Sequence, residues 1–301
     1  MTTAQAASGG RAWRLPWLRS DHFTGLALVS PTFLYAIALL AMPLLAVVMF
    51  SFWTQDYLQI DRTFTLANYE EAWSEPIYQL LMVRSLAIAG VTTVLTILLA
   101  YPIAYFVAFH VQQRKALWIF LITIPFWTSY LLRVFLWKVI LGYNGVLNST
   151  LEWLGLIKQP LTFILYNANA VVITLAHAWA PFAILPIYVA LERIDRSLLE
   201  AAKDLGDGPF RRFWRVTLPL SMGGVVAAFL IVFIPTIGDY VTPRLVGGTD
   251  GLMIANMIQA QFSKANNKPL GAALAISAML IVTSIALLIF WLNRRFTPGQ
   301  R

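Results

Sequence analysis

Few side chains in this sequence are placed to do covalent chemistry. The three histidines, His22, His110 and His177, stand far apart, and no H-E-x-x-H pair is present to hold a catalytic zinc ion. The chain has no cysteine, which excludes disulfides, cysteine-ligated zinc and thiol nucleophiles. No G-x-x-x-x-G-K-[ST] phosphate loop occurs to bind a nucleotide and magnesium. We therefore expect a protein that is not an enzyme and has no metal or cofactor of its own.

One acidic residue and several aromatic residues remain as candidates for binding. Asp239 follows an apolar stretch and could attract a cation, but Gly238-Asp239 could equally cap or break a helix. The pair also matches half of an intramembrane aspartyl protease site, yet no second aspartate in an apolar stretch completes it. Aromatic rings can face an alkylammonium group, although Trp and Tyr more commonly anchor helices at membrane surfaces. The candidate substrate pathway consists of Asp239, Tyr240, Trp127, Tyr130 and Trp179.

The elements that position these residues are long apolar stretches. Hydrophobic residues make up 59% of the 301 residues and charged residues 12%, and the mean hydropathy is +0.69, so lipid must be part of the solvent. Stretches of about 20 residues almost without charge can cross the hydrocarbon core as helices. We expect an all-α integral membrane protein with about six transmembrane helices, at residues 26–50, 85–109, 116–136, 168–191, 222–237 and 270–291.

The distribution of positive charge predicts the orientation of these helices. Fourteen of the 22 Lys and Arg residues lie in the terminal tails 1–24 and 293–301 and in the loops 110–115 and 192–220. Positively charged loops stay on the cytoplasmic side of a membrane, so both termini are predicted to be cytoplasmic. The net charge of +8 is then a consequence of topology, and we expect no nucleic acid partner.

The loop 192–220 contains more than a connector needs, because it combines many charges with apolar residues. Glu200, Ala201 and Ala202 are predicted to open a short amphipathic helix, and Gly206 is expected to turn the chain after it. The alternative is an ordinary helical hairpin that lies on the bilayer surface.

The spacing within this loop resembles a known motif. Glu200-Ala-Ala-Lys-Asp-Leu-Gly206 is followed after nine residues by Val216-Thr-Leu-Pro219, which is similar to the EAA loop of the permease subunits of ABC importers. The family pattern has Ile where Val216 stands, a conservative departure. The resemblance implies a MetI-like ABC importer permease fold, without ATPase activity in this chain. It also implies that the loop couples to an ATPase through Glu200, Ala201, Ala202, Asp204, Leu205 and Gly206.

Further stretches resemble permeases of the spermidine/putrescine type. They are Phe64–Tyr69, Tyr101–Tyr105, Pro125–Arg133, Gly145–Asn148, Gly238–Pro243 and Leu245–Gly248. Permeases for sulfate, iron or phosphonates share parts of these stretches. The resemblance thus implies a permease subunit of an ATP-driven importer for a small solute such as a polyamine, and a self-sufficient secondary transporter or channel is the alternative.

The same resemblance implies partners and a location. The partners would be a second homologous permease subunit, a cytoplasmic ABC ATPase dimer that holds ATP and Mg, and a periplasmic solute-binding protein. The location would be the bacterial inner membrane, with a permease domain over residues 25–292 between the two cytoplasmic tails.

Two outer segments are also informative. Residues 54–84 hold five acidic residues and two arginines, and this acidic surface could receive the binding protein or could simply be solvated. Residues 253–262 have the pattern of a short amphipathic helix, which we expect on the bilayer surface or in the mouth of the pathway.

Overall fold

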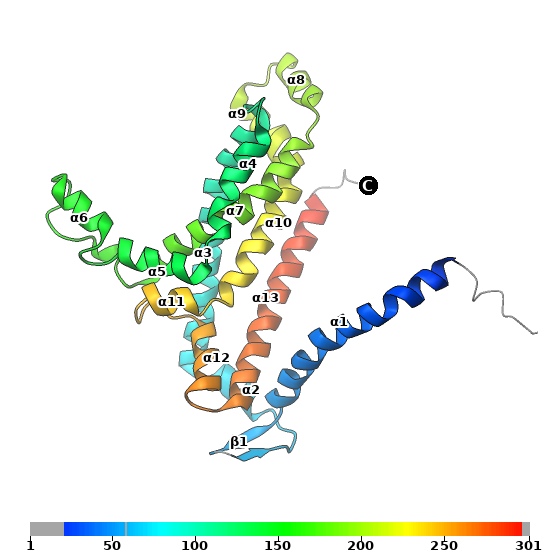
Figure 1. Ribbon diagram of the computed structural model, residues 1–301, viewed down its shortest axis with the longest axis vertical. Coiled ribbons are helices and arrows are strands. Elements are labelled where there is room, and N and C mark those ends of the chain that lie inside the picture. Colours follow the sequence, from blue (N-terminus) through cyan, green and yellow to red (C-terminus); the bar gives the residue numbers. More distant parts are fainter. Residues whose placement is uncertain (1–20, 58, 297–301) are drawn as a thin grey trace, which may run out of the picture. The chain divides into compact units, whose positions relative to one another are not determined.

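The computed structural model describes residues 21–57 and 59–296 and divides into two units near residue 50 (Figure 1). The first unit contains nearly all of α1 (Asp21–Ser51), an apolar helix that continues through Pro31 and Pro43. Its 31 residues extend about 47 Å along the helix axis, enough to cross a membrane. Its apolar composition also suits a membrane span. Most of the predicted tail 1–24 lies outside the described residues.

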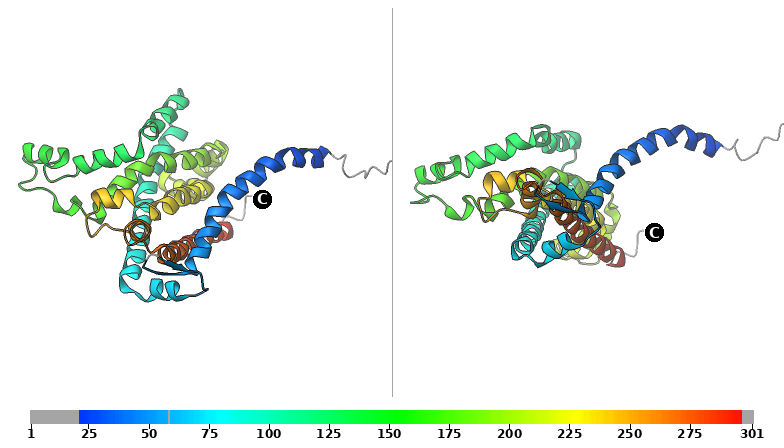
Figure 2. Two further views of the ribbon diagram at one scale, coloured as in Figure 1. Left: turned by 60° about the horizontal axis from the view of Figure 1, so that its bottom comes forward. Right: turned by 90° about the horizontal axis from the view of Figure 1, so that it is seen from below.

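The second unit, from Phe50 onward, is a bundle of long helices (Figures 1 and 2). The long members are α3 (Pro76–Phe109), α7 (Ala168–Glu192), α10 (Leu218–Ile237) and α13 (Lys268–Phe296). Each is long and apolar enough to cross a membrane, which confirms four further predicted spans. The last five residues of the predicted tail 293–301 lie outside the described residues.

The third predicted span, 116–136, is not one straight helix. α4 (Lys115–Thr123) continues into a 3₁₀ turn, η2 (Ile124–Trp127), and α5 (Tyr130–Ile140) then leaves at an angle of 85°. Among the described residues there are therefore five candidate spans, or six if this bent pair counts as one. The expectation of about six spans is confirmed in that sense.

The break has a local cause in the backbone. Pro125 has no N–H to continue a helical ladder, and Thr128 and Ser129 are both extended, with ψ of 147° and 133°. Apolar side chains continue on both sides of the break, so hydropathy alone does not reveal it. Beyond the break, α5 and α6 (Val146–Trp153) extend away from the bundle, in both views of Figure 2 as in Figure 1.

The core of the bundle lies where α3, α7 and α10 pack together. A Cβ added at Gly224 of α10 would lie 2.5 Å from the Cβ of Ala190 and 2.5 Å from the Pro186 carbonyl oxygen, so the two helices approach to backbone contact. Small residues allow such close approach between membrane helices. This packing fixes the ends of α7 and α10, which carry the functional segments described below.

Short elements connect the long helices at the two ends of the bundle. At the end opposite α8 (Arg196–Asp204), the chain forms an antiparallel hairpin, β1 (Thr54–Asp56) with β2 (Gln59–Asp61), followed by α2 (Ala67–Ser74). At the α8 end, α9 (Pro209–Arg212) and the π-helical segment η4 (Phe213–Thr217) lead directly into α10. The remaining short elements are η3 (Thr162–Ile164), α11 (Val241–Val246) and α12 (Ile254–Ser263).

The predicted amphipathic helix at 253–262 is confirmed as α12, but its place differs from the bilayer surface. α12 packs against α13 and α3, and Met253 and Ile254 are fully buried. Its apolar face is therefore covered by protein, because the loop folds back over the ends of both helices.

Candidate functional site

The predicted coupling loop begins with a capped helix. The Oδ1 atom of Asp195 accepts a hydrogen bond from the Ser197 backbone N–H at 2.9 Å and caps α8. The hydrogen bonds from Ser197, first that of its backbone, hold the pKa of Asp195 below its ordinary value. Because α8 starts at Arg196, the segment 200–202 lies in the second half of the helix. The prediction that this segment opens the helix is wrong, since it overlooked the cap at Asp195.

The helix ends in a turn that requires Gly206. Its φ of +86° is in the left-handed region, as expected for a turn glycine. The Gly206 N–H donates to the Lys203 carbonyl at 2.9 Å, and the Asp207 N–H donates to the Ala202 carbonyl at 3.0 Å. This pair of hydrogen bonds is a Schellman motif. A Cβ at Gly206 would meet no atom within 4 Å, so the turn selects glycine through its backbone conformation alone.

The apolar residues of α8 do not share one face. Ala202 is 8% exposed, whereas Leu205 is 86% exposed and Ala201 is exposed as well. Successive residues of a helix are rotated by about 100°, so Ala202 turns inward while Ala201 points outward. Glu200 and Asp204 are also exposed. Ala201 and Leu205 therefore remain open to a partner, whereas Ala202 is covered within this chain.

Aromatic residues extend the exposed apolar surface beyond the turn. Phe210 and Trp214 are 77% and 54% exposed, and with Leu205 they form what we call the loop surface. Phe213 instead points inward, with its ring 5.5 Å from that of Tyr101 in an edge contact. Tyr101 shares a 2.8 Å hydrogen bond with Ser221 of α10. One aromatic side chain thus anchors the loop to the bundle while its neighbours face outward, a division that sequence reasoning missed.

A short ion-pair cluster holds the turn against the following helix. Asp207 is largely sheltered, and its Oδ1 lies 3.8 Å from Nη1 of Arg211 and 3.4 Å from Nη1 of Arg215. Both arginines are mostly exposed, so these pairs contribute little free energy in water. They place the Asp207 carboxylate, directly after the turn, beside α9 and η4.

A second cluster joins two segments that lie 109 residues apart. The carboxylate of Asp239 accepts a 2.5 Å hydrogen bond from the Tyr130 hydroxyl through Oδ2. Its Oδ1 accepts from the backbone N–H groups of Val241 at 2.8 Å and Thr242 at 3.3 Å, and so caps α11. The hydroxyl oxygens of Tyr130 and Thr242 are 2.7 Å apart. We call Tyr130, Asp239 and Thr242 the junction, and its carboxylate, 7% exposed at Asp239, is occupied by protein donors.

Arg133, in the first turn of α5, holds the break in the third span together. Its guanidinium donates to the carbonyl oxygens of Pro125 and Thr128 across the break, and to that of Ala178 in α7 at 3.3 Å. Arg133 is buried and forms no ion pair within the described part of the chain. Because the charge is satisfied by carbonyl dipoles, it can remain in a largely apolar environment.

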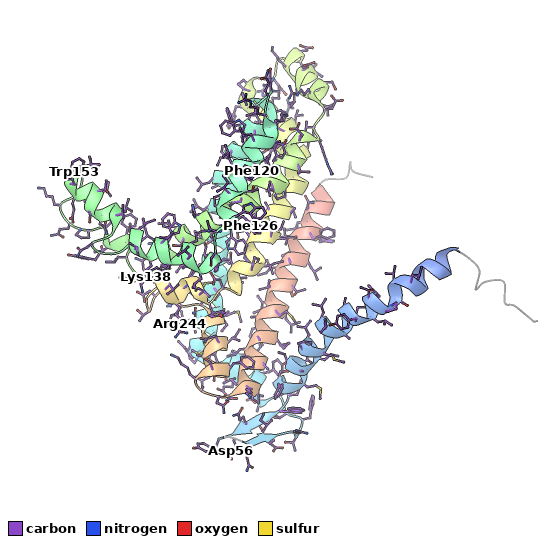
Figure 3. The ribbon with its side chains drawn as sticks, viewed as in Figure 1. Asp56, Phe120, Phe126, Lys138, Trp153 and Arg244 are labelled. Atoms are coloured by element: carbon purple, nitrogen blue, oxygen red, sulfur yellow. The ribbon has the colours of Figure 1, made fainter. Side chains whose placement is uncertain are left out.

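An aromatic cavity of about 270 Å³ lies beside the junction. It is lined by Tyr130 and Trp179 from the candidate pathway and by Phe126 and Phe182, with Thr128 and Arg133 adding polar atoms. The ring centroids of Trp179 and Phe182 lie 5.4 Å apart. The buried Nε1 of Trp179 has no hydrogen-bond acceptor among the described residues. Figure 3 shows Phe126 at the break between α4 and α5.

The five candidate pathway residues therefore separate into two groups. Tyr130, Asp239 and Trp179 meet at the junction and its cavity. Trp127 is 77% exposed and Tyr240 is 44% exposed, and neither lines this cavity. Within the described ranges, no three His, Asp or Glu side chains come close enough to hold a metal ion.

The loop and the junction both fall inside a region with known relatives. Residues 100–301 match the family described as "Binding-protein-dependent transport system inner membrane component", which is more than half of the chain. The chain belongs to this family. The permease is thus a component of a bacterial membrane transport system, and the expectation of an ABC permease fold is confirmed.

Individual relatives agree with this assignment. The permease is 38% identical over 251 residues to the spermidine/putrescine transport system permease protein PotB of Salmonella typhimurium (strain LT2), which covers 83% of this chain and 86% of the relative. It is 32% identical over 231 residues to the inner membrane ABC transporter permease protein YdcU of Escherichia coli (strain K12), with 72% of each chain covered. The solved structure of a bacterial alginate ABC transporter in complex with an alginate pentasaccharide-bound periplasmic protein shares the fold, with a TM-score of 0.70, 17% identity, and coverage of 91% of this chain and 95% of that chain.

Proposed function

We propose that the permease forms the path of an ATP-driven importer together with a second homologous permease. Its loop surface docks on a cytoplasmic ABC ATPase dimer, which holds ATP and Mg. The observation that carries this proposal is the order of the loop: a Schellman turn fixes Gly206, yet Leu205, Phe210 and Trp214 remain exposed. Large apolar side chains on an ordered surface are typical of a protein contact. Phe213 and Tyr101 then connect this contact to the bundle.

We further propose that the cargo is a polyamine such as spermidine or putrescine. The names of the relatives support this cargo, and so does the chemistry of the junction. A carboxylate beside an aromatic cavity suits an alkylammonium group, which would compete with the Tyr130 hydroxyl for Oδ2 of Asp239. Sulfate, iron and phosphonate are the alternative cargoes.

Reconstitution of the whole transporter tests both proposals. The permease is produced with its second permease, ATPase dimer and periplasmic binding protein, and uptake of labelled spermidine, putrescine, sulfate, ferric iron and phosphonate is measured in proteoliposomes. We expect ATP-dependent uptake of a polyamine. Uptake of another solute would overturn the cargo, and uptake that needs no ATPase would overturn the importer assignment.

We also propose that both termini are cytoplasmic. Because the chain has no cysteine, single cysteines at Ser8 and Gln300, which both lie outside the described residues, should react with an impermeant maleimide only from the cytoplasm. A cysteine at the exposed Lys158 should react only from the outside. Asn148 on the same side is unsuitable, since it is fully buried and bonded to the Gly142 carbonyl. Labelling of Gln300→Cys from outside would overturn this topology.

A further inference from the structure

A small pocket with a cationic rim opens between α11 and α12. Its volume is about 210 Å³, and its rim carries Arg244 of α11 and Lys264, which follows α12. Asn256 and Gln259 add polar groups, and Leu81 of α3 with Met253 adds an apolar floor. Figure 3 shows Arg244 on α11, and Figure 1 places α12 toward the end of the bundle opposite α8. If α8 faces the cytoplasm, as proposed above, this rim pocket faces outward.

The two cations of the rim pocket have no partner of their own. Within residues 21–57 and 59–296, neither Arg244 nor Lys264 forms an ion pair or a side-chain hydrogen bond. By contrast, Lys115 at the other end of the bundle is paired with Glu192 at 2.7 Å. Both rim side chains are exposed, so the pocket presents two uncompensated positive charges.

The walls of the rim pocket are held in place before anything binds. Oδ1 of Asn256 accepts from the Met253 N–H at 3.0 Å, and its Nδ2 donates to the Tyr240 carbonyl at 2.7 Å. The Ile254 N–H donates to Oγ of Ser85 in α3 at 2.7 Å. Such preorganisation lowers the entropic cost of binding.

The chemistry of the rim pocket decides among possible occupants. A volume of about 210 Å³ suits one or two side chains of a protein. A polyamine would be repelled by Arg244 and Lys264, whereas carboxylates would be attracted. We propose that the rim pocket receives acidic side chains of the periplasmic binding protein. This proposal rests on the proposed importer function and identifies where that partner docks.

The position of Asn256 links docking at the rim pocket to the junction. Through its hydrogen bond to the Tyr240 carbonyl, Asn256 connects the rim pocket to the residue that directly follows Asp239 of the junction. Docking at the rim pocket thus acts on the backbone that positions the Asp239 carboxylate. The acidic segment 54–84 is not the contact for the acidic side chains of the partner, because like charges repel.

Titration of the assembled transporter with its binding protein tests the docking site. The permease, its second permease and the ATPase are reconstituted in nanodiscs, and ATP hydrolysis is measured against the concentration of loaded binding protein at low and high salt. Arg244→Ala with Lys264→Ala should raise the half-saturating concentration about five- to twentyfold at low salt. The salt dependence should become weaker, and the maximal rate should be unchanged.

Lys158→Ala is the matched control, because Lys158 is an exposed lysine predicted on the same side that does not line the pocket. An unchanged half-saturating concentration in the double variant, equal to that of Lys158→Ala, would overturn the docking site. The importer proposal fails separately, if loaded binding protein does not stimulate the wild-type complex at all.

The titration is repeated in nanodiscs without anionic lipid. An effect that disappears there would assign the rim pocket to lipid headgroups and overturn the proposal.

A footprint gives a second, independent readout. In the cysteine-free chain, a single cysteine at Gln259 is labelled with maleimide in the presence and absence of loaded binding protein. We expect the binding protein to slow labelling at Gln259→Cys and to leave Lys158→Cys unaffected. Equal labelling rates at Gln259→Cys with and without saturating binding protein would contradict the docking site.

Discussion

The loop surface and the junction differ in what they leave unsatisfied. At the loop surface, backbone groups are paired within the turn at Gly206, but the apolar side chains of Leu205, Phe210 and Trp214 remain exposed. At the junction, the carboxylate of Asp239 is buried, and protein donors occupy both of its oxygens. The first region is complete only with a partner, whereas the second is complete within this chain.

This difference separates two uses of motif residues in a membrane protein. An exposed apolar group lowers the free energy of the system only when another surface covers it. A buried carboxylate is tolerated only when its acceptors are filled, so it fixes the relative position of α5, α10 and α11. Substitutions at the loop surface should therefore change activity without changing stability, and substitutions at the junction should change both.

The largest expected effect is at Gly206. Gly206→Val places a β-branched residue at a φ of +86° and strains the turn by about 1–3 kcal/mol. The variant should insert in the membrane, but transport and the stimulation of ATP hydrolysis by loaded binding protein should be lost. Gly208→Val is the matched control, because Gly208 has a φ of −64° and a Cβ there also meets nothing within 4 Å. Wild-type transport in Gly206→Val, with the ATPase still bound, would show that the loop is a passive hairpin.

A second comparison uses two phenylalanines three residues apart. Phe213→Ala removes an inward ring that contacts Tyr101 and should cost about 2 kcal/mol of stability. Phe210→Ala removes an exposed ring and should leave the melting temperature of the detergent-solubilised permease unchanged while weakening ATPase co-purification several-fold. If Phe210→Ala lowers the melting temperature as much as Phe213→Ala, the loop surface is part of the bundle and not a partner contact.

A third comparison tests whether the junction carries charge or only shape. Tyr130→Phe removes one hydrogen bond to a carboxylate, worth about 1.5–3 kcal/mol, and retains the charge of Asp239. Asp239→Asn removes the charge and nearly preserves the shape. If the carboxylate attracts a cationic cargo, Asp239→Asn should reduce polyamine uptake several-fold more than Tyr130→Phe does at low substrate concentration. Equal uptake in the two variants, at equal amounts of assembled complex, would leave Asp239 with a purely structural role.

The smallest expected effect is at Glu200. Its side chain is exposed and forms no ion pair within the described residues. A pairing with the ATPase at an exposed position is worth about 1 kcal/mol or less, so Glu200→Ala should reduce uptake by less than about fivefold. Complete loss of uptake, with normal amounts in the membrane, would mean that Glu200 is buried in the assembled transporter.

The long helices could be predicted from the sequence because every segment that crosses lipid needs about 20 mostly apolar residues in a helix. Hydropathy does not reveal the sharp break near Thr128, since the apolar run from 116 to 136 continues through it. Pro125 marks the place, but the contact of the Arg133 guanidinium with the Pro125 carbonyl across the break could not be predicted. The motif segments around Tyr130 and Asp239 were both recognised, but hydropathy does not indicate that they meet across 109 residues.

Within the loop, the sequence predicted the turn at Gly206 correctly because glycine adopts a left-handed backbone more readily than any other residue type. The start of α8 could also have been predicted from the sequence, since an aspartate such as Asp195 is a common helix cap. The inward direction of the Phe213 side chain could not be predicted, because it depends on the register with which the chain enters α10. That register is set by a local feature of the backbone.

η4, the π-helical segment at Phe213–Thr217, forms a wider turn than the α-helices on either side of it. A single wide turn accommodates one residue more than an α-helical turn. Each residue turns an α-helix by about 100°, so the extra residue decides which side of α9 faces the bundle. Removing one residue from this segment would rotate the loop about the axis of α10. Phe210 and Trp214 would then face a different direction, although every transmembrane contact of α10 would be intact.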